Sequence, residues 1–236
     1  MVRILVLNPV ATGAWNELTY NYLRKIAHPN TEVVVRNISE GPKVIESVYD
    51  RDYAAHYAVR EIIKAEEEGF DAVIINCFDD PGLYAVREVT DTLVLGIGET
   101  SITTALLLGF RIAIISTGEN AKLLYYRRAV ELGIDKRIVY TGGIEIGVFD
   151  LRSNEGKVMD LLLSEGGKAV EQYGADVIVL GCSGFIGMAE ELSERLEVPV
   201  IDPTKVTFKV AESLAKIGIK HSRKHLFNRL RHGYSQ

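Results

Sequence analysis

The feature that most constrains the fold of this chain is a short segment that occurs twice. Residues 69–77 read GFDAVIINC and residues 174–182 read GADVIVLGC, so a glycine, an aspartate, an apolar run and a final cysteine match without a gap. A weaker match lies upstream, between RILVLN at residues 3–8 and RIAIIS at residues 111–116. The repetition predicts two similar halves of roughly a hundred residues each, which is a usual domain size.

The pattern between these repeats indicates the class of fold. Short β-branched runs alternate with longer amphipathic stretches, as expected for parallel strands that are connected by crossover helices. Strands are expected at residues 4–7, 33–36, 72–77, 93–97, 112–116, 177–182 and 198–201. Helices are expected at residues 16–27, 53–68, 121–132, 156–172, 189–196 and 206–217. We therefore predict an α/β protein with two similar Rossmann-like parallel-sheet domains.

Composition narrows the possible partners. The chain of 236 residues is 47% hydrophobic, enough to bury a core, and its net charge of -5 gives no basic footprint for nucleic acid. Asn8-Pro9 interrupts the first apolar run, residues 4–7, before the core of a signal peptide could develop. No apolar stretch approaches the ~18 residues needed to span a bilayer. A small-molecule partner is expected, with no nucleic acid and no membrane.

The cysteines indicate both a compartment and a site. Cys77 and Cys182 are too few for a disulfide framework, so we expect a reducing, cytoplasmic environment. Both lie at the carboxyl ends of their predicted strands, which is where parallel sheets bind ligands. If the two halves face each other about a pseudo-twofold axis, the two sulfurs approach a shared cleft from opposite sides.

Two opposed thiols suit one class of reaction. Racemisation of a carbon acid requires a base on one face of the stereocentre and an acid on the other, and a thiolate and a thiol can supply both roles. The unperturbed pKa of a thiol, ~8.5, is close enough to neutrality for either protonation state to be reached. We expect Cys77 and Cys182 to exchange the proton with no cofactor. No metal site is expected, because the histidines show no ligand spacing with the cysteines.

Each cysteine is followed by residues that can tune its thiol. Asp80 is expected to cap a helix that begins at Pro81, and Ser183-Gly184 leaves room for a ligand to approach backbone N–H groups. Such amides lower a thiol pKa and stabilise the oxyanion of an enolate-like intermediate. A single cysteine at the end of an apolar strand would more simply be a small core residue. Two cysteines at equivalent ends of repeated strands favour catalysis.

Short motifs around the cysteines and near the start of the chain carry a family resemblance. The chain contains CFDDPG at residues 77–82, LGCSG at residues 180–184, Asn8-Pro9, and Gly41-Pro42 followed by Ile45-Glu46. With these motifs it resembles the hydantoin racemase family of the aspartate/glutamate racemase superfamily, over roughly residues 1–218. The resemblance implies an isomerase with its active site in the cleft between two domains, and the two cysteines as the acid/base pair.

The resemblance also implies how the domains divide the chain. The first domain would be discontinuous, with residues 1–98 and 205–236, and the second would span residues 99–204. The chain after the second domain would return to pack on the N-terminal half. Hinges would then lie near residues 96–98 and 202–203.

By matched position, the resemblance assigns substrate-binding roles. Asn8 would orient the substrate, and Gly41 and Pro42 would shape the pocket wall. The amides around Asp79 and Ser183 would hold substrate carbonyls. The other candidate binding residues are Thr12, Phe78, Thr117 and Gly184. The asparagine-proline and glycine-proline pairs are also consistent with ordinary turns.

The substrate class follows from the motifs that the chain lacks. Members of the family commonly continue Asn-Pro-Asn-Thr or Asn-Pro-Asn-Ser, whereas this chain has Val10 after Asn8-Pro9, with Thr12 beyond it. Glutamate racemases carry Asn-Thr after the first cysteine and Thr-His or Thr-Tyr after the second, and this chain has neither pair. A cyclic imide or ureide, such as a 5-substituted hydantoin or allantoin, suits backbone hydrogen bonds better.

Other functions are compatible with the same pattern. Within the superfamily these are an amino-acid racemase of the aspartate/glutamate type and a maleate cis-trans isomerase. A decarboxylase is disfavoured, because decarboxylases of this kind manage with one cysteine. From a different class, a non-catalytic two-lobed protein could close on a small ligand without transforming it.

Two segments have no assigned chemistry. Residues 116–119 either line the cleft or form a plain helix N-cap. Residues 220–236 contain five basic side chains of lysine and arginine and no acid. They are expected to form a solvated or subunit-packing helix, and a homo-oligomer is expected.

Overall fold

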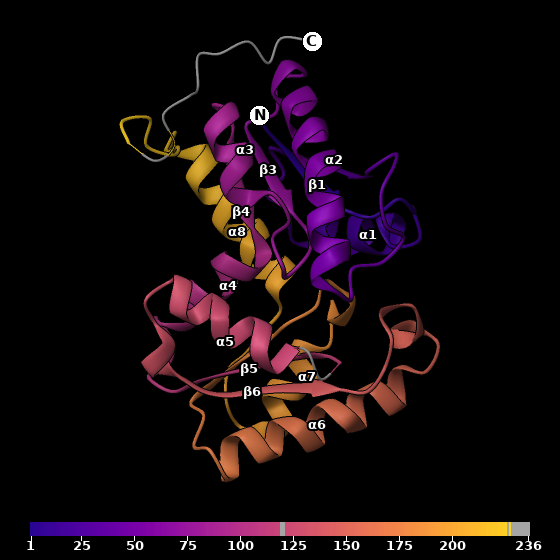
Figure 1. Ribbon diagram of the computed structural model, residues 1–236, viewed down its shortest axis with the longest axis vertical. Helices are drawn as coiled ribbons and strands as arrows, with labels where there is room; N and C mark the ends of the chain where they lie inside the picture. Colours follow the sequence, from indigo (N-terminus) through magenta and orange to yellow (C-terminus); the bar gives the residue numbers. More distant parts are fainter. Residues whose placement is uncertain (119–120, 226, 228–236) are drawn as a thin grey trace. The chain divides into compact units, whose positions relative to one another are not determined.

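The computed structural model describes residues 1–118, 121–225 and 227, and Figure 1 shows the course of the chain. Its strands are β1 (Val2–Asn8), β2 (Thr31–Asn37), β3 (Ala72–Ile75), β4 (Leu93–Gly96), β5 (Ile112–Thr117), β6 (Ile138–Ile144), β7 (Val177–Leu180) and β8 (Val200–Ile201). Its α-helices are α1 (Asn16–Ile26), α2 (Val48–Glu67), α3 (Leu83–Val89), α4 (Ile97–Ala105), α5 (Ala121–Glu131), α6 (Glu155–Glu171), α7 (Ala189–Leu196) and α8 (Pro203–Lys216). Among the described helices, none is long and apolar enough to cross a lipid bilayer.

The strands form two four-stranded sheets, and the strand pairs of the described chain are parallel. The first sheet has the order β2-β1-β3-β4 and the second has the order β6-β5-β7-β8. In both sheets the first strand of the half lies in the interior, with the second strand on one side and the third on the other. The predicted α/β fold with two similar parallel sheets is confirmed.

The chain forms two compact units. One comprises Met1–Gly96 and the chain from Phe208 onward, and the other comprises Ile97–Thr207. Each unit contains one of the sheets and its own cluster of buried apolar side chains. The chain passes from the first unit to the second between β4 and α4, and returns within α8.

In the first unit, α2 and α3 share a core with one face of the sheet. Because side chains alternate along a strand, Leu5 and Leu7 of β1 point to the same face as Val73 and Ile75 of β3. These four side chains form one buried cluster with Ile62 of α2. The cluster fixes β1 and β3 as neighbours in the middle of the sheet.

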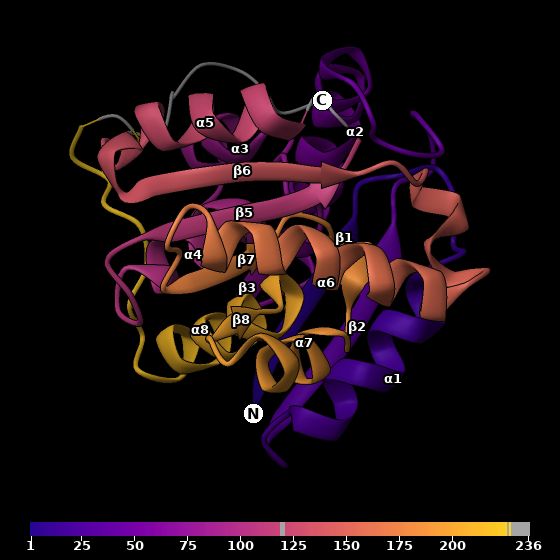
Figure 2. The same cartoon turned by 90° about the horizontal axis from the view of Figure 1, so that it is seen from below.

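In the second unit, helices cover both faces of the sheet. α5 and α6 lie on opposite sides of β5 and β6 (Figure 1), and α6 and α7 lie side by side (Figure 2). Val158 and Leu162 of α6 and Leu192 of α7 are buried with Ile178 and Leu180 of β7. The third strand of this half, β7, is therefore central in the same way as β3.

The repeated segment has the same local structure in both units. The residues concerned are Gly69, Asp71 and Arg3 in the first unit and Gly174, Asp176 and Arg111 in the second. The glycine follows α2 or α6 with a φ of 77° or 64°, a left-handed conformation that suits glycine at the end of a helix. The aspartate carboxylate accepts a 2.8 Å hydrogen bond from the backbone N–H of the arginine. Each repeat therefore ties the third strand of its half to the first.

One strand was not predicted, and one expectation about local structure is corrected. The strand is β6, an edge strand that contains a glycine pair at residues 142–143, and edge strands tolerate such residues. Asp80 does not cap a helix at Pro81, because α3 begins at Leu83 with Gly82 as its N-cap. Asp80 is instead buried, and its carboxyl group lies against Gly96 at the end of β4.

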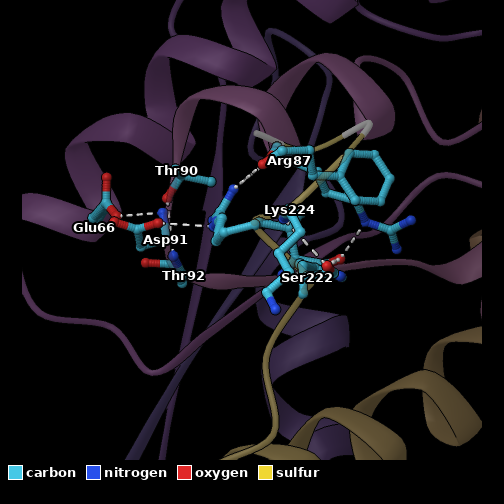
Figure 3. Close-up of polar contacts among 11 residues, drawn as sticks. Glu66, Arg87, Thr90, Asp91, Thr92, Ser222 and Lys224 are labelled. Atoms are coloured by element: carbon cyan, nitrogen blue, oxygen red, sulfur yellow. Dashed lines mark hydrogen bonds and ion pairs between the residues drawn. The ribbon is translucent and has the colours of Figure 1, made fainter. Parts of the chain in front are cut away.

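The described part of the C-terminal segment is not helical. Residues 220–225 run irregularly beside β4, one of the two outer strands of the first sheet, where His221 Nε2 lies 3.0 Å from the nitrogen and 2.8 Å from the oxygen of Val94. Arg223 forms an ion pair with Asp91 at 2.8 Å (Figure 3). The expected C-terminal helix is therefore wrong for these residues, since the segment packs against the edge of the sheet. Residues 226 and 228–236 lie outside the described chain.

Candidate active site

Each sheet has one point at which the order of its strands reverses. In the first sheet the chain goes from β1 to β2 on one side and then to β3 on the other side of β1, so the switch point lies between β1 and β3. The same reversal places the switch point of the second sheet between β5 and β7. Ligands of parallel sheets bind beyond the carboxyl ends of the strands at such points. The residues that follow these four strands are therefore the candidates for a site.

Cys77 lies just beyond β3, in the turn that leads to α3. The N–H of Asn76 donates to the carbonyl of Leu7 at 2.8 Å, which extends the pairing of β3 with β1 past the end of the strand. The N–H of Asp80 donates to the carbonyl of Cys77 at 3.0 Å and closes the turn. Cys77 is a free cysteine and is partly exposed. Backbone hydrogen bonds on both sides thus hold this thiol at the first switch point.

Cys182 occupies the corresponding position beyond β7. The N–H of Gly181 donates to the carbonyl of Ile115 at 2.7 Å, so β7 is extended along β5 in the same way. The N–H of Gly184 donates to Cys182 Sγ at 3.3 Å. Cys182 is a free, buried cysteine. An N–H group directed at sulfur stabilises a thiolate more than a thiol, so the second switch point can hold a negatively charged sulfur.

Two hydroxyl groups fix the residue that precedes Cys182. Ser116 Oγ donates to the carbonyl of Gly181 at 2.5 Å, and the Tyr125 hydroxyl donates to the same oxygen at 3.2 Å. Ser116 lies in β5, and Tyr125 lies on α5; both side chains are buried. Two strands and a helix therefore meet around the carbonyl next to this thiol.

A row of asparagines crosses the carboxyl end of the first sheet. Asn76 Nδ2 donates to Asn8 Oδ1 at 2.7 Å. Asn8 Nδ2 donates to Asn16 Oδ1 at 2.8 Å, and Asn16 Nδ2 donates to Asn37 Oδ1 at 2.9 Å. Asn37 Nδ2 donates to the carbonyl of Ile38 at 2.8 Å. This asparagine row, Asn76-Asn8-Asn16-Asn37, joins the residue before the first cysteine to β1, α1 and β2.

The loops that follow β1 and β2 lie side by side. The N–H of Ala11 donates to the carbonyl of Pro42 at 2.7 Å, which brings the Asn8-Pro9 loop against the Gly41-Pro42 loop. Thr12 Oγ1 accepts a hydrogen bond of 3.3 Å from the N–H of Ala14 within its own loop. Two motifs that are far apart in the sequence are therefore neighbours beside the first switch point.

The groups at the switch points suit acid/base chemistry. Thiols can exchange a proton with a carbon acid, and preorganised N–H donors stabilise the charge that develops on a carbonyl oxygen. Among the residues that the structure describes, no group of three or more His, Cys, Asp or Glu side chains could hold a metal ion.

Comparison with known proteins identifies the family. The sequence profile of the Asp/Glu/Hydantoin racemase family matches residues 4–211. The chain belongs to this family. Over 94% of its length, this racemase is 35% identical to the hydantoin racemase of Pseudomonas sp. (strain NS671), 89% of which is covered. It is 34% identical to the hydantoin racemase of Paenarthrobacter aurescens, over 94% of each protein.

A solved structure supports the same assignment. The structure of allantoin racemase from Klebsiella pneumoniae matches with a TM-score of 0.93 and 29% identity, covering 99% of this chain and 95% of that one. The relatives are named as racemases, which are isomerases, and the chain is an isomerase of this kind.

The predicted binding residues of the racemase lie in loops or at strand ends, at the carboxyl edges of its two sheets. In the first unit these are Asn8, Thr12, Gly41, Pro42, Phe78 and Asp79, and in the second they are Thr117, Ser183 and Gly184. Phe78 is buried, and Gly184 uses its N–H for the sulfur of Cys182. Their contacts with a substrate stay predictions. Glu119, in the segment with two open interpretations, lies outside the described residues of the racemase.

Part of each switch point was not predicted from the sequence. The residues concerned are Asn16, Asn37 and Asn76 in the first unit, and Tyr125 in the second. A signal for Asn37 and Asn76 was present, because the three neighbouring strand segments read VLN at residues 6–8, VRN at 35–37 and IIN at 74–76. Three parallel strands that each end in asparagine bring these amides to one edge. No local pattern marked the tyrosine, which reaches Gly181 from a helix.

Proposed function

We propose that this racemase inverts the stereocentre of a cyclic ureide, a 5-substituted hydantoin or allantoin, with Cys77 and Cys182 as the acid/base pair. The observation that carries the proposal is the position of the two free cysteines, each just beyond the third strand of its unit at a switch point. The names of the related hydantoin and allantoin racemases support the substrate class.

The proposed reaction moves one proton and leaves no net change in charge or oxidation state. One cysteine begins as a thiolate and the other as a thiol. The thiolate takes the proton from C5 of the ureide, and the electron pair of the C–H bond delocalises onto the C4 carbonyl as an enolate. The other thiol then protonates C5 from the opposite face and becomes a thiolate. The product leaves with the protonation states of the two cysteines exchanged.

Donors near each thiol would stabilise the negative charges that form during the reaction, on the enolate or on a thiolate. Asn8 lies at the first switch point with its side chain amide held by hydrogen bonds on both sides. In the second unit, the N–H of Gly184 stabilises the thiolate form of Cys182. Neutral carbonyls and N–H groups of a ureide match such amides, and a ring carbon flanked by a carbonyl supplies the acidic proton.

The mechanism sets requirements that complete the proposal. Both thiols have to reach the same carbon from opposite faces, so residues 1–98 with 205–236 and residues 99–204 would act as two domains around a shared substrate. The thiols supply both proton-transfer roles, and no cofactor takes part. Free thiols persist in a reducing compartment, so we place the enzyme in the cytoplasm, and a homo-oligomer stays a prediction.

The test is isotope exchange with single enantiomers. The protein is incubated in D₂O with several 5-substituted hydantoins and with allantoin, and optical rotation and deuterium at C5 are followed together. Cys77→Ala and Cys182→Ala are measured beside the wild type, with Ser213→Ala on the exposed side of α8 as the matched control. We expect racemisation with deuterium uptake in the wild type and the control, and loss of racemisation in both cysteine variants.

Two results would contradict the proposal in different ways. Unchanged activity in either cysteine variant would exclude the two-thiol mechanism. Absence of exchange with all ureides would exclude the substrate class and would direct the same assay to aspartate, glutamate and maleate.

A further inference from the structure

We infer that Asn16 and Asn37 are positioning residues that fix which way the side-chain amide of Asn8 faces. The inference rests on the proposed function, because it gives Asn8 the role of hydrogen-bond donor to a substrate carbonyl. Asn16 and Asn37 act through Asn8 and do not themselves touch the substrate.

The direction of the asparagine row is set at its far end. A side-chain amide presents an oxygen and an NH₂ group of similar size, so two orientations fit the same space. Asn37 has only one of them available, because its amide lies 2.8 Å from the main-chain carbonyl of Ile38, which can only accept. Asn37 therefore directs its nitrogen to Ile38 and its oxygen to Asn16.

This orientation is passed along the row. Asn37 Oδ1 accepts from Asn16 Nδ2 at 2.9 Å, so the oxygen of Asn16 faces Asn8 and accepts from its nitrogen at 2.8 Å. The oxygen of Asn8 then accepts from Asn76 at 2.7 Å. Reversal of one amide would set two oxygens or two NH₂ groups against each other, and at the buried contact between Asn8 and Asn76 such a mismatch costs about 1–3 kcal/mol. The amides of the row therefore keep their orientation together.

Asn8 is the member of the row with a functional consequence. Its side chain is 3% exposed and lies at the end of β1, beside the first switch point. Within the described chain its oxygen bonds to Asn76, and one of its two N–H bonds is directed to Asn16. The group that Asn8 can offer a ligand is therefore an N–H donor in a fixed orientation. A preorganised donor stabilises a carbonyl oxygen that gains negative charge.

The site would then select a substrate by whether it presents a hydrogen-bond acceptor or a donor to Asn8. A carbonyl beside the reacting carbon satisfies the Asn8 donor, whereas an N–H group at the same place would meet a second donor. A ureide has both carbonyl and N–H groups around its ring. The orientation of Asn8 would therefore also decide in which orientation the ring binds. Through the asparagine row, the carbonyl of Ile38, which follows the outer strand β2, would thus influence the orientation in which the substrate binds.

A purely structural role makes a different prediction. If the row only joined β1, β2 and α1, each substitution would lower stability, and activity would fall in step with it. If the row positions Asn8, a variant stays active when Asn8 and Asn16 each still have a hydrogen-bond acceptor. It loses activity when one of these acceptors is removed, whatever the stability of the variant.

The test uses variants with the same side-chain shape as asparagine. Asn37→Asp keeps an acceptor for Asn16 and loses only the bond to Ile38, whereas Asn37→Leu loses both. Asn16→Leu removes the acceptor for Asn8 directly. Asn154→Ala is the matched control, because Asn154 caps α6 in the other unit, and the loss of such a cap costs about 1 kcal/mol of stability without touching the row.

We expect a graded loss of racemase activity. Asn16→Leu lowers kcat about tenfold or more with little change in KM, because the donor acts mainly on the developing oxyanion. Asn37→Leu lowers kcat about three- to tenfold, and Asn37→Asp stays within about twofold of the wild type although its Tm falls. The Asn154→Ala control loses stability and keeps its kcat.

A second readout does not depend on any substrate. Hydrogen exchange of the Asn8 side-chain NH₂ group, followed by ¹⁵N NMR, should be slow in the wild type and in Asn37→Asp and faster in Asn16→Leu. Equal kcat in Asn37→Leu and Asn37→Asp, or an unchanged kcat in Asn16→Leu, would overturn the inference. A wild type that racemises no ureide would instead overturn the proposed function, and the exchange pattern would still report on the row.

Discussion

Gly181 leaves no room for a side chain between β7 and the hydroxyl of Ser116. A Cβ atom at this position would lie 2.6 Å from Ser116 Cβ, 2.9 Å from its Oγ and 3.2 Å from Cε2 of Tyr125. These are the two residues whose hydroxyl groups hold the Gly181 carbonyl. The close approach therefore couples packing at a single residue to the position of the next one, Cys182.

Gly181→Ala is expected to impair activity more than stability. Overpacking at a buried position costs about 1–3 kcal/mol, and a displacement of the thiol by a fraction of an ångström lowers kcat about tenfold or more. Gly167→Ala on α6 is the control, because nothing lies within 4 Å of the added carbon, and the change should raise stability by about 0.5–1 kcal/mol. Urea unfolding and ureide racemisation measure the two effects, and normal kinetics in Gly181→Ala would contradict the coupling.

The residues of the candidate site were only partly predictable from the sequence. Cys77, Cys182 and Asn8 could be selected because each ends a recognisable apolar run. Asn16 could not, since its partner Asn37 lies twenty-one positions away in sequence and is brought near only by the parallel pairing of β1 with β2. Contacts of this kind depend on register, which a single sequence does not state.

At the scale of elements, most strands and helices could be predicted because their apolar periodicity is unbroken. β1, β3, β5 and β7 are central and almost wholly buried, so they read as continuous apolar runs. β6 was missed because an edge strand requires less burial, and its sequence IVYTGGI contains a glycine pair. The turn at Asp80 was misjudged because its carboxyl group packs against Gly96, which is distant in sequence.

A buried carboxylate on α8, that of Glu212, is bonded to the loop that follows α1 in the first unit. Glu212 accepts from the backbone N–H of His28 at 2.8 Å and forms an ion pair with Lys209, whose Nζ also donates to the carbonyl of Ile26 at 3.0 Å. Burial by itself raises the pKa of Glu212, but hydrogen bonds from Lys209, Thr31 and the His28 amide outweigh it. The net pKa lies below the ordinary value of 4.5.

Glu212→Gln is therefore expected to lower stability in a pH-dependent way. A carboxyl group whose folded-state pKa is depressed contributes stability that is complete above its unfolded-state pKa and is lost as pH falls through the folded-state value. The deficit of the variant should be about 1–3 kcal/mol near pH 7 and should shrink below about pH 4.5. Urea unfolding at several pH values measures it, with Glu171→Gln, exposed on α6, as the control. A deficit that does not change with pH would exclude this role.

The C-terminal segment helps to cover the β4 edge of the first sheet. β4 is one of the two outer strands, and His221 Nε2 lies within hydrogen-bond distance of both the N–H and the carbonyl of Val94, which also accepts from Arg87 Nε at 3.1 Å. Unpaired backbone groups at a sheet edge favour pairing with other chains, so a side chain at this position protects the edge.

His221→Ala should destabilise the protein more than Asp91→Asn. Loss of the imidazole leaves the buried N–H of Val94 without its partner, at a cost of about 1–3 kcal/mol, whereas the Val94 carbonyl keeps its hydrogen bond from Arg87 Nε. Asp91→Asn weakens the ion pair with Arg223. The side chains of Arg223 and Asp91 are 28% and 54% exposed, and exposed pairs of this kind contribute about 0–1 kcal/mol. Thermal unfolding compares the two variants, and light scattering should detect more self-association in His221→Ala. Equal stabilities would argue against the edge-covering role.

At the scale of the whole molecule, the two units are built alike and carry one cysteine each. The matched junctions of the repeat tie β3 to β1 and β7 to β5, so both thiols are delivered by the same construction. The surroundings of the thiols differ, however. Amides of the asparagine row support the first switch point, whereas the hydroxyls of Ser116 and Tyr125 support the second. A duplicated scaffold with unlike surroundings suits a pair of groups that approach one carbon from two faces.

If the two thiols serve one carbon, their contributions to racemisation cannot be additive. Cys77→Ser or Cys182→Ser alone removes either the base or the acid from every turnover, so each variant should lose about 10²–10⁴ in rate, and the double variant should be no slower than either.

Each single variant keeps one thiol and should still exchange the C5 proton of one enantiomer with D₂O without inverting it. The preferred enantiomer should be opposite in the two variants, because the proposed mechanism requires the thiols to act on opposite sides of the ring. Chiral chromatography with mass detection measures both quantities. Exchange of the same enantiomer by both variants would mean that the cysteines act from one side, and the pairing of the two units in a single reaction would have to be abandoned.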